Sequence, residues 1–383
     1  MIRHYLLFVV LLAAGFILPG CRTPAPSDPL PTTADTEVKQ LFPSPAYAIH
    51  TNTWWKPDLI EQDLALVNEM EFNWVKQKFP WREIEGIEKG KYDWYRPDRI
   101  VDAVEAEGLN LLVRLDRQPF WSEPQENLWH ENQAPGDLQD FADYCGAVTE
   151  RYRGRIAAYQ VWNEPNLGRE WGELPPDPAH YSELLKVCYT AIKEADPQAI
   201  VISAGLAPTG TTSDQAMPDT DYLQGMYDAG AAAYFDVLGV NAPGYKAPPE
   251  LPPEEAEQPE YGGGRWFAFR HVEDIRDIMV ANGDGEKQIA ILEMGWTLDQ
   301  VNPEYAWFAV DESTQADYLV RAYQYAAENW QPWIGLMTTI YIPDFDWTEE
   351  NEQYWWSILL PDGTPREAFH ALRDMPKIQP GVE

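Results

Sequence analysis

Strand-like and helix-like segments alternate eight times along this chain of 383 residues. Short apolar runs bounded by turn residues predict strands, and longer segments with apolar residues at helical spacing predict the helices between them. Strands are expected at 46–49, 74–79, 109–115, 156–161, 200–204, 237–240, 288–292 and 334–342, and helices at 58–70, 96–107, 137–152, 178–195, 221–233, 266–281, 314–329 and 365–374. Eight successive βα units predict an α/β fold: a single-domain (β/α)8 TIM barrel over residues 41–378.

Long connections follow four of the predicted strands, at 120–136, 242–264, 294–313 and 343–354. In a barrel of this kind the site is built from the loops at the carboxyl ends of the strands. Elaborated βα loops on that face therefore predict a cleft for an extended ligand.

The segment 159–167 reads Tyr-Gln-Val-Trp-Asn-Glu-Pro-Asn-Leu and ends the fourth predicted strand. Pro165 cannot donate to a sheet and favours an extended conformation at Glu164. A carboxylate and a carboxamide, Glu164 and Asn163, are thus expected at the mouth of the barrel. From chemistry alone, a solvated Glu at a strand end is an equally good interpretation.

A second carboxylate, Glu293, ends the seventh predicted strand. The four residues before it, 289–292, are all apolar, as expected for a parallel strand that is buried on both faces. Counting strands places both glutamates on the same face of the barrel.

The sequences Trp-Asn-Glu-Pro at 162–165 and Leu-Glu-Met-Gly-Trp at 292–296 resemble the fourth-strand and seventh-strand motifs of the clan A glycoside hydrolases, nearest to the family 39-like and family 5 (cellulase-like) members. The resemblance implies that Glu164 is the general acid/base, that Glu293 is the nucleophile and that Asn163 binds a sugar hydroxyl. It also implies a reaction that needs no cofactor.

Three further residues are assigned by the same resemblance. In the segment 241–245, Asn-Ala-Pro-Gly-Tyr, Tyr245 corresponds to a tyrosine that hydrogen-bonds the nucleophile, and Asn241 stands where the family often has His. Lys76 stands where an Arg commonly lies five residues before Trp81. The alternatives are a packed tyrosine at the barrel rim and a lysine paired with an acid.

Arg114 and Asp116 share one face of the third strand because side chains alternate along a strand. A structural ion pair is favoured over a substrate contact for Arg114. Trp121 and Trp296 are the leading candidates for sugar-stacking platforms, since aromatic faces suit the apolar faces of sugar rings. Further aromatic candidates, each of which could instead be core, are Trp54, Trp55, Tyr341 and Trp347.

The net charge of −34 argues against nucleic acid and anionic membrane surfaces as partners, because both need basic protein surfaces. It also disfavours a polyanionic substrate, unless a local basic cleft overrides the overall charge. The six His residues show no zinc-type spacing, so no metal site is expected.

The N-terminus predicts a targeting segment. Residues 5–18 form an apolar stretch that is short for a membrane span, and Leu18-Pro19-Gly20-Cys21 resembles a bacterial lipobox, although Pro19 is unusual there. We expect a lipoprotein signal peptide over 1–20, a flexible tether over 21–40 and an extracytoplasmic protein, anchored to the bacterial cell surface by a lipid on Cys21. A secretory signal and an uncleaved anchor are the alternatives.

The other two cysteines, Cys145 and Cys188, fall in predicted amphipathic helices, and two buried free thiols are favoured over a disulfide. Together the motifs predict a retaining glycoside hydrolase that acts on an oligo- or polysaccharide, expected to be β-linked. A transglycosylase with the same residues and a non-catalytic carbohydrate-binding barrel are the alternatives.

Overall fold

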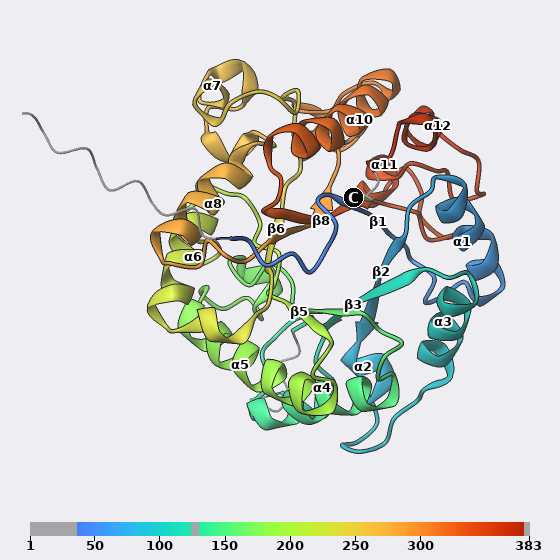
Figure 1. The fold of residues 1–383 in the computed structure, drawn as a ribbon, viewed down its shortest axis with the longest axis vertical. Helices are drawn as coiled ribbons and strands as arrows, with labels where there is room; N and C mark the ends of the chain where they lie inside the picture. Colours follow the sequence, from blue (N-terminus) through green and yellow to red (C-terminus); the bar gives the residue numbers. More distant parts are fainter. Residues whose placement is uncertain (1–36, 124–129, 379–383) are drawn as a thin grey trace, which may run out of the picture. The chain divides into compact units, whose positions relative to one another are not determined.

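The computed structural model describes residues 37–123 and 130–378 (Figure 1). Within this part eight parallel strands form one sheet in the order β5-β4-β3-β2-β1-β8-β7-β6. Isolated parallel bridges from Ile202 to Val237 and from Leu206 to Val240 connect the two ends of the sheet. The strands therefore form a nearly closed barrel, which confirms the predicted fold class.

All eight predicted strands are present, with small differences at their ends. Their bounds are β1 (Ala46–His50), β2 (Trp74–Pro80), β3 (Asn110–Asp116), β4 (Ala158–Val161), β5 (Ile200–Ile202), β6 (Leu238–Asn241), β7 (Ile289–Met294) and β8 (Ile334–Ile340).

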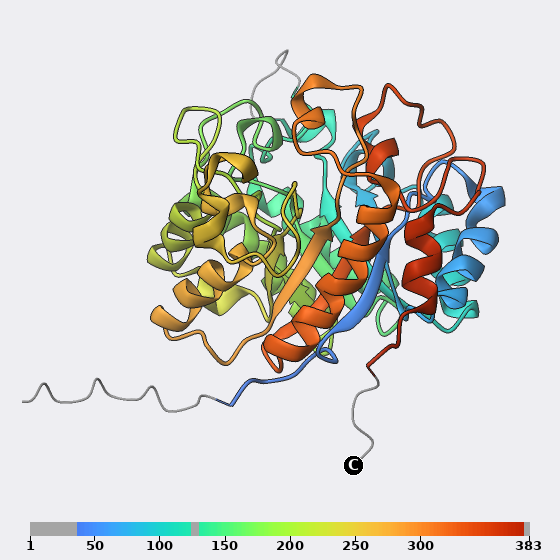
Figure 2. The same ribbon diagram turned by 90° about the horizontal axis from the view of Figure 1, so that it is seen from above.

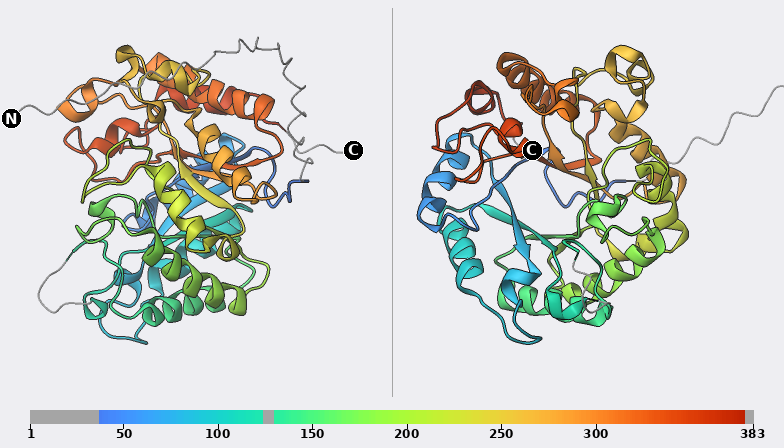
Figure 3. Two further views of the ribbon diagram at one scale, coloured as in Figure 1. Left: turned by 90° about the vertical axis from the view of Figure 1, so that its left-hand side faces the viewer. Right: turned by 180° about the vertical axis from the view of Figure 1, so that it is seen from behind.

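Helices surround the strands (Figure 3). The main ones are α1 (Ile60–Glu69), α3 (Tyr95–Ala106), α4 (Leu138–Arg151), α5 (Pro178–Ala195), α6 (Asp219–Asp228), α8 (His271–Ala281), α10 (Glu312–Asn329) and α12 (Glu367–Asp374). Short helices in the connections are α2 (Trp81–Ile84), α7 (Pro253–Ala256), α9 (Pro303–Ala306) and α11 (Glu352–Trp356). Figure 2 shows α10 and α12 side by side on the outside of the sheet.

Local sequence explains several helix ends. The carboxylates of Asp137, Asp177 and Asp311 accept backbone hydrogen bonds at the starts of α4, α5 and α10, which satisfies N–H groups that have no partner within the helix. The predicted helix at 221–233 ends early because Gly230 adopts a left-handed conformation, with φ of 80°.

The barrel interior changes from apolar to polar along its strands. Trp74, Leu112 and Ala158 belong to an apolar cluster with side chains from the other strands. Two residues further along the same strands stand Lys76, Arg114 and Gln160, all buried. Because side chains alternate with a period of two, these polar groups follow directly above the apolar layer and face the carboxyl ends of the strands.

Cys145 of α4 and Cys188 of α5 form a disulfide with a Cα–Cα distance of 5.6 Å, so the prediction of two free thiols was wrong. The two helices pack closely at this point: a Cβ added at Gly146 of α4 would already be in van der Waals contact with the side chain of Ala191 of α5, at 3.7 Å. The amphipathic pattern of each helix predicted burial, but it could not show which residue of the neighbouring helix would stand opposite.

No helix in residues 37–123 and 130–378 is long and apolar enough to span a bilayer. The expected signal peptide, Cys21 and most of the expected tether lie outside the described residues.

We expect the double substitution Cys145→Ala/Cys188→Ala to lower the free energy of unfolding by about 2–4 kcal/mol, because the bridge closes a long loop in the unfolded chain. Chemical denaturation of the wild type and the variant under non-reducing conditions measures this difference. Reductant should destabilise the wild type and leave the variant unchanged; equal stability of the two proteins would contradict the prediction.

Candidate active site

A cavity of about 360 Å³ lies at the carboxyl ends of the strands and contains both predicted catalytic glutamates. Its charged lining residues are Glu164, Glu293, Glu304, Glu352 and Arg169, and its aromatic lining residues are Tyr245, Tyr305, Phe308, Tyr341 and Trp356. Strand counting therefore placed both carboxylates correctly, although they are 129 residues apart in the chain.

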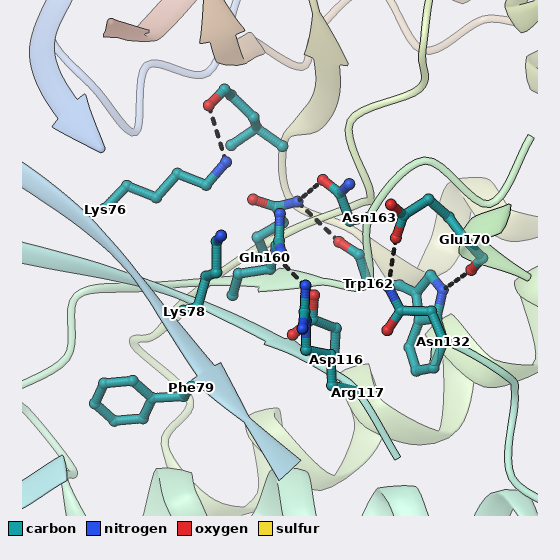
Figure 4. A network of polar contacts seen from close by, with 12 residues as sticks. Lys76, Lys78, Phe79, Asp116, Arg117, Asn132, Gln160, Trp162, Asn163 and Glu170 are labelled. Carbon is teal, nitrogen blue, oxygen red and sulfur yellow. Dashed lines mark hydrogen bonds and ion pairs between the residues drawn. The ribbon is translucent and has the colours of Figure 1, made fainter. Parts of the chain in front are cut away.

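Glu293 of β7 lies beside two cationic side chains, Lys76 and Arg114, and beside His50. Oε1 lies 3.4 Å from Lys76 Nζ, 3.5 Å from Arg114 Nη1 and 4.0 Å from His50 Nδ1. Lys76 Nζ also donates to the carbonyl of Leu292 at 2.9 Å (Figure 4). All three groups approach the same carboxylate oxygen, Oε1.

The charge of Glu293 follows from these neighbours. Burial raises the pKa of the carboxyl, but Lys76, Arg114 and Lys78 together outweigh burial and hold the pKa below its usual value. Burial also lowers the pKa of Lys76 to about 8, against the opposing effect of Glu293. At neutral pH the structure thus contains an ionised carboxylate, as a nucleophile requires.

His50 is a site residue that sequence reasoning missed. It is the last residue of β1, and neither ring nitrogen has a hydrogen-bond partner among the described residues. Burial, with added repulsion from Lys76 and Lys78, holds the pKa of His50 well below its usual value, so the ring is neutral. The only signal in the sequence was that this His directly follows the predicted strand 46–49.

Glu164 stands on a strained turn. Trp162 and Glu164 have positive φ values of 71° and 41°, which are uncommon for residues other than Gly. The backbone N–H of Glu164 donates to Gly205 O at 3.0 Å, and Trp162 Nε1 donates to Glu170 O at 2.9 Å. These bonds fasten the turn on both sides, and the Glu164 side chain enters the cavity.

Two residues hold the Glu164 carboxylate. Asn241 Nδ2 donates to Oε1 at 2.9 Å, and Arg169 Nη2 lies 3.1 Å from Oε2. Asn241 was predicted as a site residue by the resemblance, because it stands where the family often has His. Arg169, which is largely exposed, was not predicted, because it lies in the loop after β4 and no local pattern distinguishes it.

Arg114 forms the expected ion pair with Asp116, at 2.8 Å between Nε and Oδ2. It also reaches Glu293, so the pair connects β3 to the nucleophile candidate. Asn163 is buried, and its side-chain oxygen lies 3.5 Å from Gln160 Nε2 (Figure 4). The contact of Asn163 with a sugar hydroxyl stays a prediction.

Tyr245 lines the cavity but does not hydrogen-bond Glu293. Its hydroxyl donates to Pro208 O at 3.4 Å, and its ring packs against Phe267 and Phe308. The expected bond to the nucleophile is therefore absent between these described residues. The cations around Glu293 take the place of that bond.

Trp296 was wrongly predicted as a sugar platform. It is 0% exposed, its Nε1 donates to Ala247 O at 2.9 Å, and the indole packs directly on Gly244. Trp121 is partly buried, donates to Glu85 O at 2.7 Å and is not among the residues lining the cavity. Tyr341 does line it, and its ring lies 5.1 Å from that of His50 at an interplanar angle of 63°.

The aromatic residues that do line the cavity come from long βα loops. Tyr305 and Phe308 follow β7, and Trp356 follows β8. The loop lengths predicted an elaborated face, but the sequence could not show which aromatic residues turn inward.

Two further carboxyl groups have raised pKa values. Burial, followed by repulsion from Glu164, raises the pKa of Glu170 to about 7. Burial also raises the pKa of Glu352 to about 7, and repulsion from Glu164 and Glu293 adds to this, while Arg169 opposes it. Groups that titrate near neutral pH thus lie around the two glutamates.

Among the described residues no cluster of potential ligands could hold a metal ion.

Known proteins share this architecture. A family model described as beta-galactosidase, of glycoside hydrolase family 42, matches residues 50–121. A family 39 glycoside hydrolase from the gut symbiont Bacteroides cellulosilyticus WH2 superposes with a TM-score of 0.64 at 21% identity, over 87% of this chain and 63% of that one. The chain therefore spans less than two thirds of that enzyme.

Two other enzymes superpose over a similar share of the chain. Xylanase 10B from Thermotoga maritima has a TM-score of 0.55 at 15% identity, over 87% of this chain and 94% of that one. The beta-galactosidase from Marinomonas ef1 has a TM-score of 0.56 at 13% identity, over 86% and 58%. The chain has the fold of the clan A glycoside hydrolases. No curated protein sequence matches the chain.

We expect Lys76→Met to raise the pKa of Glu293, because it removes the largest attractive charge that opposes the effect of burial. Carboxyl ¹³C NMR titration of glutamate-labelled protein measures the pKa, with Glu293→Gln assigning the signal. Lys89→Met, which changes a lysine paired with Asp140 and Asp143 on the surface, is the control. An unchanged Glu293 titration in Lys76→Met would refute this electrostatic account.

Proposed function

We propose that the protein is a retaining glycoside hydrolase that cleaves O-glycosidic bonds of an oligo- or polysaccharide. The observation that carries this proposal is the pair of glutamates in one cavity, each at a strand end but in different surroundings. Glu293 lies among cations that keep it ionised. Glu164 instead contacts the amide of Asn241 and the guanidinium of Arg169, and it lies near Glu170 and Glu352, whose pKa values are raised. A retaining mechanism needs this division between a nucleophile and an acid.

In the first step Glu293 attacks the anomeric carbon while Glu164 protonates the departing oxygen, and a glycosyl ester forms on Glu293. In the second step Glu164 takes a proton from water, which attacks the anomeric carbon and releases Glu293. Attack by Oε2 suits the structure, because Lys76 and Arg114 both hold Oε1. Their charges stabilise Glu293 again as it leaves in the second step.

The names of the similar structures support a β-linked substrate. They include a xylanase, an exo-beta-1,4-mannosidase and two beta-galactosidases. The aromatic side chains of the cavity, Tyr305, Phe308, Tyr341 and Trp356, suit the apolar faces of sugar rings.

We expect Glu293→Gln to abolish turnover of every substrate, because the nucleophile is lost. Glu164→Gln should spare the first step for substrates with activated leaving groups, which need little protonation, and azide should rescue its second step. The reaction should proceed with retention, with the two carboxyl groups about 5–5.5 Å apart in the enzyme. Steady-state kinetics on aryl glycosides and NMR of the first-formed anomer provide the measurements.

Lys89→Met is a control for both variants, since its change lies on the surface. An inverted product, or a carboxyl separation of about 6.5–9.5 Å in a sugar complex, would remove the nucleophile role from Glu293.

We also propose that the protein works outside the cytoplasm, anchored by a lipid on Cys21. The lipobox-like sequence 18–21 motivates the anchor. The Cys145–Cys188 disulfide supports an oxidising compartment, where such bonds persist.

Cys21→Ala should move the protein from the membrane fraction to the soluble fraction or block its processing. Cell fractionation, with mass spectrometry of the mature N-terminus, measures this. A soluble wild-type protein that begins at another residue would exclude the lipid anchor.

A further inference from the structure

Cationic side chains gather at one place in a strongly acidic chain. Lys76 and Lys78 of β2 and Arg114 of β3 point into the barrel near Glu293, and Arg117 follows β3 at the rim. Strand register places Lys78 directly beside Arg114. With a net charge of −34 for the whole chain, this concentration of positive charge must serve a local purpose.

Most of these cations are matched by carboxylates. Lys76 and Arg114 both contact Glu293, and Arg114 also pairs with Asp116. Arg117 Nη1 lies 2.6 Å from Glu131 Oε1. Their charges are thus satisfied without a ligand.

Lys78 differs from them. Its ammonium group forms no ion pair or hydrogen bond within residues 37–123 and 130–378, although the side chain is only partly exposed. Burial, then repulsion from Arg114 and Arg117, lowers its pKa to about 8. Glu293 and Asp116 oppose this effect from a distance, but neither carboxylate contacts the ammonium group. An ammonium that is partly removed from water without a direct carboxylate contact is unfavourable, and a bound anion would offset that cost.

The position of Lys78 relates it to the reaction site. It follows Lys76 by two residues, so the two side chains leave the same face of β2. The two residues lie about 6.6 Å apart along the strand, and Lys78 is the one nearer the barrel mouth. Figure 4 shows both ammonium groups projecting from β2 toward the middle of the barrel, on the side of Gln160. Lys78 is not among the residues that line the cavity around the two glutamates, but it pairs in register with Arg114, whose Nη1 lies 3.5 Å from Glu293 Oε1. Lys78 therefore stands on the strand beside the cation that contacts Glu293.

We propose that Lys78 binds an anionic substituent of the substrate, so that the enzyme acts on a glycan with an acidic sugar at the cleaved position. The inference rests on the proposed function and names its substrate class. A carboxylate of a uronic acid and a sulfate ester share the required chemistry. The acidic surface repels densely charged polyanions, so the acidic sugar is an isolated one within the glycan.

A neutral sugar is the competing occupant, since an ammonium group also donates to hydroxyls. A contact between two opposite charges is the stronger one, because both partners are ionised. The two occupants therefore differ in how binding responds to removal of the charge at position 78.

Binding of matched sugars to the full-length protein tests the proposal. The probes are D-glucuronate and D-galacturonate, the 6-sulfates of glucose and galactose, and the neutral parents D-glucose and D-galactose, each titrated by ligand-observed NMR. At least one acid should bind 10-fold or more tightly than its neutral parent. Preference for the uronate or for the sulfate identifies the source of the anion.

The variants connect that preference to Lys78. Lys78→Met should reduce the ratio of acid to neutral affinity at least 10-fold, Lys78→Arg should retain much of it, and Lys89→Met should leave it unchanged. The preference of the wild type should also fade as the pH rises above about 8, because Lys78 then loses its proton, and it should persist in Lys78→Arg, which stays charged. A preference that fades equally in Lys78→Arg would instead report on Lys76, whose pKa is also about 8. If Lys78→Met fails to fold, the pH series and Lys78→Arg decide.

The proposal is overturned if no acid binds more tightly than its neutral parent, or if the preference survives in Lys78→Met. Because the readout is binding, it can fail separately from the proposed function. Acid-selective binding without cleavage of any glycan would contradict the hydrolase alone, whereas cleavage of neutral glycans without acid preference would contradict only the role of Lys78.

Discussion

The attraction between the Glu293 carboxylate and the cations of β2 and β3 is the interaction on which the site depends. Burying the Glu293 carboxylate at the barrel mouth without a partner would cost several kcal/mol of folding free energy, and burying Lys76 or Arg114 without a partner would also cost several kcal/mol. Lys76, Arg114 and Glu293 are stable there only as a group. The group keeps the carboxylate ionised inside protein, and it joins three separate strands of the barrel at the point where chemistry is expected.

The period-two geometry of the strands makes this arrangement possible. An apolar layer that includes Trp74, Leu112 and Ala158 fills the lower barrel, and the next inward positions carry polar side chains. The apolar layer keeps water away from below, which strengthens the electrostatic interactions above it. Stability and function are thus divided between successive layers of the same strands.

The sequence carried enough information for the strands and for the two glutamates, because apolar runs, Pro165 and strand counting are local signals. It did not reveal His50 or Arg169, whose importance depends on neighbours brought close only by closure of the barrel. The burial of Trp296 and the disulfide were missed for the same reason. Each depends on how a loop or helix packs against another segment of the chain. The Trp296 indole, for example, is buried because Gly244 of another loop packs directly against it.

The disulfide between α4 and α5 also has a topological meaning. The strand β4 and the turn with Glu164 lie between Cys145 and Cys188, so this part of the chain forms a covalently closed ring. A protease that cuts one peptide bond inside the ring opens the backbone without producing two separate pieces. In surroundings rich in secreted proteases, the segment that carries Glu164 and Arg169 would stay attached to the barrel after such a cut.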